Sequence, residues 1–171
     1  TLNEASQIQA TLQALQHVRD HGEIIVVDGG STDNTMELAQ KDTDRVIITQ
    51  SGRARQMNAG ASVAHGDVLV FLHADTLVPS NAFSCMNEAL KDKQVVGGAF
   101  DLGIRSNRFI FKVIGKIASL RSRLTRIPYG EQTIFIRNAY FHAIGGYREI
   151  PLMEIRPSNN PAAIIAKRET S

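Results

Sequence analysis

A run of four branched apolar residues, Ile24 to Val27, ends in Asp28, Gly29 and Gly30, and it constrains the fold more than any other segment. Such a run is typical of a buried strand. In an open α/β sheet, ligands bind at the carboxyl ends of the strands, which is where Asp28 stands. Its carboxylate can accept hydrogen bonds from a ribose hydroxyl or a base N–H, and the glycines let a ligand approach the backbone. The segment therefore indicates a nucleotide-type ligand.

Helical and strand patterns alternate along the rest of the chain. The spacing of apolar residues predicts helices at residues 8–18, 36–40, 56–64, 81–90, 109–124 and 139–144. It predicts strands at residues 24–27, 45–49, 68–72, 94–102 and 133–136. Ser31, Thr32 or Asp33 can cap the helix at 36–40. This alternation favours an α/β fold with a mostly parallel central sheet flanked by helices.

A length of 171 residues suits a single domain, residues 1–171, with a substantial core. Two places depart from a complete α/β domain. Residues 1–6 resemble the loop after a first strand, and residues 154–161 pass from an acid to a proline-bounded turn where a helix is expected. We therefore expect that residues are missing before Thr1 and around 154–161.

The overall charge gives no reason to expect a nucleic-acid partner, because 19 basic and 17 acidic residues leave a net charge of +2. Basic residues do cluster between 105 and 126, either as a solvated helix face or as a patch for phosphate or for peripheral contact with an anionic membrane. The single cysteine, Cys85, is expected to be a buried structural thiol. It fits a reducing, cytoplasmic location, including the inner face of the membrane. No apolar run has the length of a membrane span, and no secretory signal is present.

A second strand end, at His73 and Asp75, repeats the pattern seen at Asp28. Residues two apart on an extended chain point to the same side, so both side chains could face one ligand. A carboxylate and an imidazole can hold a divalent cation that neutralises a diphosphate. The alternative is a histidine satisfied by the backbone and an aspartate that caps the next helix.

The segment from Gly52 to Gly60 combines two arginines with the start of a helix. Guanidinium groups of Arg53 and Arg55 and free backbone N–H groups suit a phosphate, although an exposed basic loop is an equal alternative. Gln56 and Asn58 add polar contacts that a sugar or ribose could use.

Two acids, Glu131 and Glu154, follow turns that contain proline. Either carboxylate could act as the general base that deprotonates a sugar hydroxyl. The alternative for each is an ordinary surface acid.

Three segments taken in order, residues 1–4, 26–33 and 72–75, resemble family 2 glycosyltransferases of the GT-A fold. The similarity is greater to the bacterial subgroup of radical-SAM/selenodomain-associated transferase 2. Its hallmarks resemble residues 52–60, 72–76, 97–100, 128–132 and 150–154. The resemblance implies transfer of a sugar, with inversion, from a nucleoside-diphosphate sugar to an acceptor that the sequence does not specify.

The resemblance also assigns roles to individual residues. It places Thr1, Glu4, Asp28 and Gly29 around the base and ribose. It implies further donor contacts from Arg53, Arg55, Asn58 and the segment His73, Ala74 and Asp75. His73 and Asp75 occupy the metal position, which implies Mn²⁺ or Mg²⁺, and Glu154 matches the first acid of a catalytic Glu–Asp pair.

Two residues depart from the family pattern. His73 stands where the family has an acid, and Ile155 stands where it has the second acid of the pair. A nucleotidyltransferase of similar topology and an inert nucleotide-sugar-binding domain are therefore alternatives. The sequence specifies neither the donor sugar nor the oligomeric state.

Overall fold

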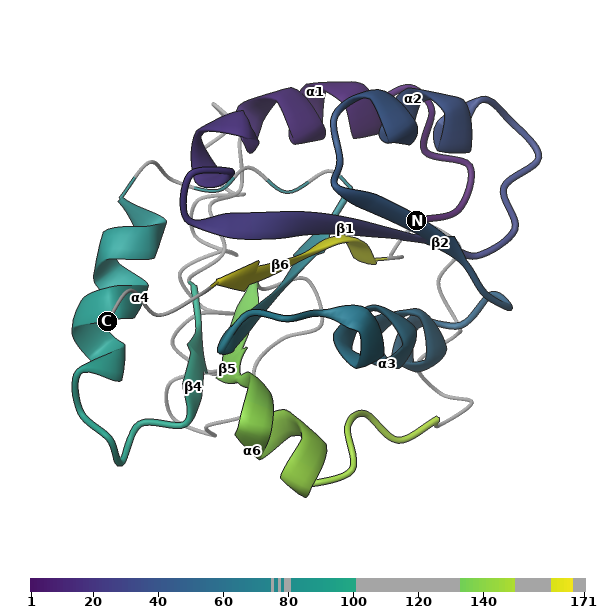
Figure 1. Ribbon diagram of the computed structural model, residues 1–171. Coiled ribbons are helices and arrows are strands. Elements are labelled where there is room, and N and C mark those ends of the chain that lie inside the picture. Colours follow the sequence, from purple (N-terminus) through teal and green to yellow (C-terminus); the bar gives the residue numbers. More distant parts are fainter. Residues whose placement is uncertain (75, 77, 79–80, 101–132, 150–160, 168–171) are drawn as a thin grey trace, which may run out of the picture.

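The computed structural model describes residues 1–74, 76, 78, 81–100 and 133–149, and the backbone of 161–167. Helices and strands alternate through most of this range (Figure 1). The helices are α1 (Ile8–Ala14), the short 3₁₀ helix η1 (Gln16–Val18), α2 (Thr35–Lys41), α3 (Arg53–Val63), α4 (Ala82–Leu90) and α6 (Asn138–Ala143). The strands are β1 (Gly22–Asp28), β2 (Arg45–Ile48), β3 (Val68–His73), β4 (Gly97–Ala99), β5 (Ile134–Arg137) and β6 (Pro161–Lys167).

The strands form one six-stranded sheet in the order β2-β1-β6-β3-β5-β4. β1 and β2 pair in parallel, whereas β6 pairs antiparallel with both β1 and β3. β5 is antiparallel to β3 and to β4, so β1, β2, β3 and β4 share one direction. The sheet is therefore mixed, and the prediction of a mostly parallel sheet is wrong in this respect, because β5 and β6 run opposite to their neighbours.

Helices cover both faces of the sheet, with α1 and α2 on one face and α3 and α6 on the other (Figure 1). Alternate residues of β1 point to opposite faces. Ile24 and Val26 pack with Leu12 in one buried cluster, while Ile25 and Val27 pack with α3 and α6 in the other. Because both faces are covered, β1 and β3 read as unbroken apolar runs rather than as alternating ones.

Most predicted elements within the described residues are found within a few residues of their expected bounds, with one correction at α3. The predicted helix at 109–124 lies outside the described residues. α3 begins at Arg53 and not at Gln56, so both arginines of the segment lie on the helix. Gly52 precedes it with φ of 144°, a value that favours glycine. Cys85 is exposed on α4, and the expectation of a buried thiol is wrong, because Met86 and Ala82 are the α4 residues that face the core.

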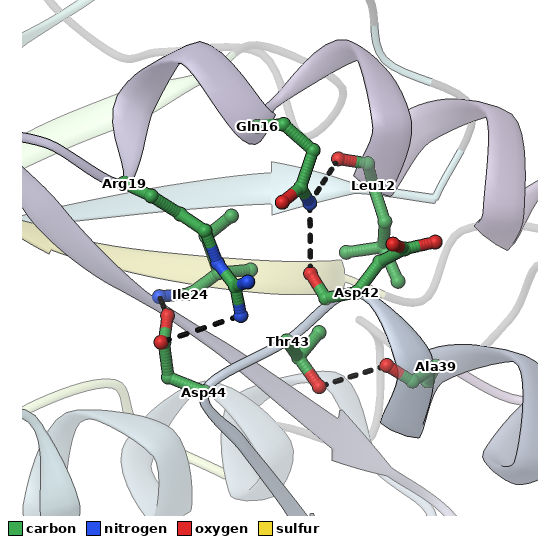
Figure 2. A network of polar contacts seen from close by, with 8 residues as sticks. All are labelled: Leu12, Gln16, Arg19, Ile24, Ala39, Asp42, Thr43 and Asp44. Carbon is green, nitrogen blue, oxygen red and sulfur yellow. Dashed lines mark hydrogen bonds and ion pairs between the residues drawn. The ribbon is translucent and has the colours of Figure 1, made fainter.

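Polar contacts tie α1 and η1 to the turn between α2 and β2, at the amino end of β1 (Figure 2). Gln16 Nε2 donates to the carbonyl of Asp42 at 2.9 Å. Asp44 Oδ2 accepts from the backbone N–H of Ile24 at 2.8 Å, and its Oδ1 accepts from Arg19 Nη2 at 3.3 Å. These contacts fix the end of the sheet that lies away from the candidate site.

Within the part of the chain that the structure describes, no helix combines the length and the apolar character that a membrane crossing requires.

Candidate functional site

The first five residues run beside the turn that follows β1, and backbone hydrogen bonds join the two. The Thr1 carbonyl accepts from Gly29 N at 2.8 Å. Asn3 N donates to Ser31 Oγ at 2.8 Å, and Asn3 Oδ1 accepts from Thr32 N at 2.9 Å. Asn3 has a φ of 54°, in the left-handed region that asparagine tolerates better than most residues. Residues 1–5 and the β1–α2 turn thus form a single polar surface.

Asp28 is fully buried at the end of β1, and its carboxylate turns back onto its own chain. Oδ2 accepts from the backbone N–H groups of Gly30 and Ser31 at 2.8 and 2.7 Å, and Oδ1 accepts from Ser31 Oγ at 2.5 Å. Gly30 has a φ of 95°, which a side chain would strain. The observed role of Asp28 is to shape the turn, and contact with a base stays a prediction.

Asp33 is the polar residue that contacts the start of α2. Its Oδ1 accepts from Thr35 N at 3.0 Å and from the Thr35 hydroxyl, and these bonds lower the pKa of Asp33 below its ordinary value. Thr35 Oγ1 in turn accepts from Glu4 N at 2.8 Å. The residue at the cap position is Asn34, without a side-chain capping bond, so the predicted cap at 31–33 is replaced by this Asp33–Thr35 turn.

Gln56, on the first turns of α3, is completely buried and bridges three segments. Its Nε2 donates to the carbonyls of Thr1 and Val27 at 2.9 and 3.1 Å. Its Oε1 accepts from Gly52 N at 3.4 Å. A Cβ added at Gly29 would lie 3.2 Å from Gln56 Nε2, so the glycine gives this side chain its space. The sequence suggested that Gln56 could contact a sugar or ribose. In the structure its side chain is buried and instead connects α3 to the β1 turn.

Arg53 contributes a positive charge to the site and is paired with His73. Arg53 Nη2 lies 2.5 Å from His73 Nε2, and His73 is only 6% exposed at the end of β3. A guanidinium can only donate, so Nε2 must carry the lone pair and the ring proton lies on Nδ1. The carbonyl of the next residue, Ala74, accepts from the Thr11 hydroxyl of α1. The turn beyond β3 is thereby held with the imidazole facing Arg53.

The proposed metal ligands were His73 and Asp75, and the structure describes only the first. The Nε2 lone pair that would bind a metal already accepts a hydrogen bond from Arg53. Among the residues that the structure describes, no three His, Cys, Asp or Glu side chains are grouped as a metal site would need. As it stands, His73 therefore does not fit the role of a metal ligand.

Asn58, five residues beyond Arg53 on α3, holds the segment that follows α6. Its Nδ2 donates to the Tyr147 carbonyl and its Oδ1 accepts from Tyr147 N, each at 2.9 Å. Gly146 has a φ of 71°, and a Cβ there would lie 2.6 Å from Asn58 Oδ1. The Tyr147 ring packs against Phe71, with centroids 5.4 Å apart. The Asn58 amide is therefore engaged in holding this turn.

Two further contacts link α3 to the same segment. Arg55 Nη2 forms a 2.8 Å ion pair with Glu149 Oε2, and its Nη1 donates to Gln50 Oε1 at 2.8 Å. This contact lowers the pKa of Glu149 below its ordinary value. Burial raises the pKa of Tyr147 to about 12, although the nearby charge of Arg53 acts in the opposite direction. Arg55 is thus placed toward the segment that leads to residue 150, and not beside His73.

The structure brings together Thr1, Glu4, Asp28 and Gly29 at the carboxyl end of β1, and Arg53, His73 and Ala74 at the carboxyl end of β3. Helix α3 contacts the first group through Gln56 and the second through Arg53, whereas Asn58 contacts the turn after α6. Asp75, Glu131 and Glu154 lie outside the described residues. The bridging role of Gln56 and the involvement of Tyr147 were not predicted from the sequence. The Gly145–Gly146 pair was a signal for the second, because two glycines with positive φ fix where Tyr147 stands.

Known proteins show the same sequence pattern and fold. A family model described as Glycosyl transferase family 2 matches residues 1–149. The chain is 33% identical over 162 residues to a PGL/p-HBAD biosynthesis glycosyltransferase of Mycobacterium bovis, covering 86% of the chain and 60% of that protein. It is 28% identical over 119 residues to glycosyltransferase GlyG of Streptococcus pneumoniae, covering 64% of the chain and 40% of that protein.

A solved structure supports the fold. Mannosyltransferase PcManGT from Pyrobaculum calidifontis, in complex with GDP-Man and Mn²⁺, superposes with a TM-score of 0.64 at 20% identity. The match covers 93% of this chain and 47% of the mannosyltransferase, so the chain spans about half of that protein. The predicted GT-A-like α/β fold class is confirmed by this likeness.

Proposed function

Because this chain belongs to glycosyl transferase family 2, we propose that it transfers a sugar from a nucleoside-diphosphate donor to an acceptor hydroxyl. The observation that carries the proposal is the polar site at the carboxyl ends of β1 and β3, where ligands bind in α/β sheets. There the β1 turn, the first residues of the chain and the Arg53–His73 pair meet. The proposal covers residues 1–171 as one domain, within the bacterial subgroup of radical-SAM/selenodomain-associated transferase 2.

The nucleotide region of the site is proposed at the β1 turn. Thr1 and Glu4 would flank the base and ribose, with Gly29 allowing close approach. Support comes from the hydrogen bonds that hold residues 1–5 against this turn. Asp28 would act mainly through the turn, because its carboxylate oxygens accept bonds from Gly30 and Ser31.

The diphosphate region is proposed at the end of β3, at His73, Ala74 and Asp75. The family resemblance implies a divalent cation, Mn²⁺ or Mg²⁺, at this position, and the PcManGT complex contains Mn²⁺. We propose Asp75 as the residue that would hold such a cation. His73 does not fit as its partner, because Nε2 accepts from Arg53.

The acceptor region is proposed near Glu154, with Glu131 as the alternative base. In a direct displacement, the acceptor oxygen bonds to the anomeric carbon while the bond from that carbon to the diphosphate oxygen breaks. The carboxylate takes the hydroxyl proton, and the electron pair leaves with the nucleoside diphosphate. One displacement inverts the anomeric configuration. Arg55 supports this placement indirectly, since its ion pair with Glu149 holds the chain just before residue 150.

The cellular setting is part of the same proposal. A single cysteine fits a reducing cytoplasm, and the basic residues between 105 and 126 fit contact with the inner face of an anionic membrane. The partners are a nucleoside-diphosphate sugar and an acceptor, without nucleic acid.

A thermal-shift panel of nucleoside diphosphates and nucleotide sugars, with and without Mn²⁺, tests the proposal. A ligand present at one hundred times its Kd stabilises the folded state by about 2.7 kcal/mol. We expect at least one nucleoside diphosphate and its sugar to raise the melting temperature, while the matching nucleoside monophosphate raises it less. If no nucleotide stabilises the chain under either condition, the transferase proposal is refuted. Release of a nucleoside diphosphate rather than pyrophosphate on turnover separates it from a nucleotidyltransferase.

A further inference from the structure

The site carries a fixed organic cation at the position where the family resemblance implies a metal. Arg53 opens α3, and its guanidinium contacts the imidazole of His73 at 2.5 Å. His73 stands at the end of β3 and is almost fully buried. An arginine remains charged at every pH that a protein survives.

We propose that Arg53, positioned by His73, supplies the positive charge that binds the donor diphosphate, so that nucleoside diphosphates bind this chain without a divalent cation. The inference rests on the proposed function, because it assumes that the ligand is a nucleoside diphosphate. It differs from that function by assigning the charge to a side chain and by making the metal dispensable for binding.

The chemistry of His73 favours this assignment over a metal site. A metal at Nε2 would need the lone pair that Arg53 now uses, and it would place a second cation beside the guanidinium. Like charges in a partly buried site repel strongly, because the local dielectric constant is below that of water. An acid at position 73 would attract both a metal and Arg53 by its charge, whereas an imidazole that accepts from Arg53 carries no negative charge to attract a metal.

The geometry of Arg53 suits a diphosphate. A guanidinium has N–H donors in a planar fork that matches two phosphate oxygens.

The surrounding contacts fix the position of Arg53 relative to the nucleotide region of the site. Gln56, three residues along α3, is bonded to Thr1 and Val27, which fixes the first turn of the helix against the end of β1. Tyr147 lies close enough to Arg53 for the guanidinium charge to influence its hydroxyl. A cation fixed in this way can bind phosphate without the reorganisation that a mobile surface arginine would need.

Isothermal titration of UDP and GDP into the full chain, once in EDTA and once in Mn²⁺, tests the inference. We expect the better nucleotide to bind in EDTA with a Kd within about threefold of its value in Mn²⁺. Arg53→Gln should weaken binding in EDTA by about 10- to 100-fold, the loss expected for a charged hydrogen-bond donor. Arg19→Gln is the matched control, because it removes one arginine at the other end of β1 (Figure 2).

Two further variants keep the test decisive. Arg53→Lys retains the charge without the fork, so it should lose less affinity than Arg53→Gln, and melting temperatures verify that each variant folds. His73→Asp should create an acidic pair with Asp75, and Mn²⁺ should then tighten nucleotide binding by about tenfold or more. Loss of the free Mn²⁺ EPR signal reports the same change without nucleotide turnover.

The outcomes separate the inference from the proposed function. If wild-type protein binds a nucleotide only with Mn²⁺, and Arg53→Gln binds equally well, the inference is overturned while the transferase proposal stands. If no nucleotide binds in EDTA or in Mn²⁺, both are overturned. Binding in EDTA that Arg53→Gln abolishes and Arg19→Gln retains supports the inference.

Discussion

Replacing Gln56 by methionine removes the polar bridge between α3 and the β1 turn while nearly preserving the side-chain volume. The substitution deletes two hydrogen bonds from Nε2, to Thr1 and Val27, and the longer bond from Gly52 N at 3.4 Å. Each of the two carbonyls keeps one other donor, since the Thr1 oxygen accepts from Gly29 N and the Val27 oxygen from Thr1 N. The substitution therefore removes one hydrogen bond from each carbonyl, and each carbonyl keeps its other hydrogen bond.

The magnitude follows from these contacts. Two buried bonds at about 1 kcal/mol each, and a smaller contribution from the long bond to Gly52, give a loss of about 2–3 kcal/mol. For a chain of 171 residues, such a loss lowers the melting temperature by roughly 5–10 °C. Methionine restores part of the packing, because volume-conserving changes are the best tolerated in a core.

Urea denaturation measures the effect as a lower midpoint with an unchanged slope. Gln9→Met is the matched control, because Gln9 is exposed on α1 and its replacement should change stability by less than about 0.5 kcal/mol. A Gln56→Met variant with the stability of the wild type would refute the argument that this side chain joins α3 to the β1 turn.

Two other predictions concern the turn after α6. Gly146→Ala should destabilise the protein by about 1–3 kcal/mol, because φ is 71° and the new Cβ would meet Asn58 Oδ1; in a double-mutant cycle, Asn58→Ala should relieve part of that loss, and strict additivity would contradict the proposed clash. Burial raises the pKa of Tyr147 to about 12, so the unfolded chain releases this proton first, and stability should fall as the pH rises from about 10 toward that value. Tyr147→Phe should show a smaller fall in melting temperature over the same window, and equal slopes would show that Tyr147 is not the group responsible.

The elements that sequence patterns predicted best are those whose local environment repeats along the chain. The apolar runs at 24–27 and 68–72 lie within β1 and β3, because helices cover both faces of the sheet there. The strand order was not predictable in the same way. β6 pairs with both β1 and β3, and such contacts between distant segments leave no local period in the sequence.

The start of α3 shows how two basic residues can mislead a prediction of local structure. The segment after Gly52 contains arginine, alanine and glutamine, all good helix formers. Its two arginines were nevertheless expected before the helix, either in a phosphate site or in an exposed basic loop. Gly52 with its φ of 144° ends the preceding loop, so the helix begins at Arg53. Arg53 and Arg55 were therefore expected before the helix, whereas both lie on it.

The side-chain partners could not be read from the sequence, because they depend on how distant elements pack. Asp28 stands at a strand end, where ligands commonly bind. Its carboxylate nevertheless accepts hydrogen bonds from the backbone N–H groups of Gly30 and Ser31 in the turn that follows. Asn and Asp side chains commonly bond to the backbone of the residues that follow them. His73 gave no sign of its partner, since Arg53 precedes it by twenty residues.

One helix organises the whole site, and this accounts for the density of polar residues between 52 and 60. Arg53 reaches the end of β3, Gln56 reaches the end of β1, and Asn58 reaches the turn after α6. Each side chain contacts a different segment, so α3 fixes the proposed nucleotide, diphosphate and acceptor regions relative to one another. A shift of α3 would move all three regions together, whereas loss of one of these side-chain contacts would release only the region that it holds. Single substitutions on α3 should therefore separate nucleotide binding from acceptor binding, with Arg53 affecting the first and Asn58 the second.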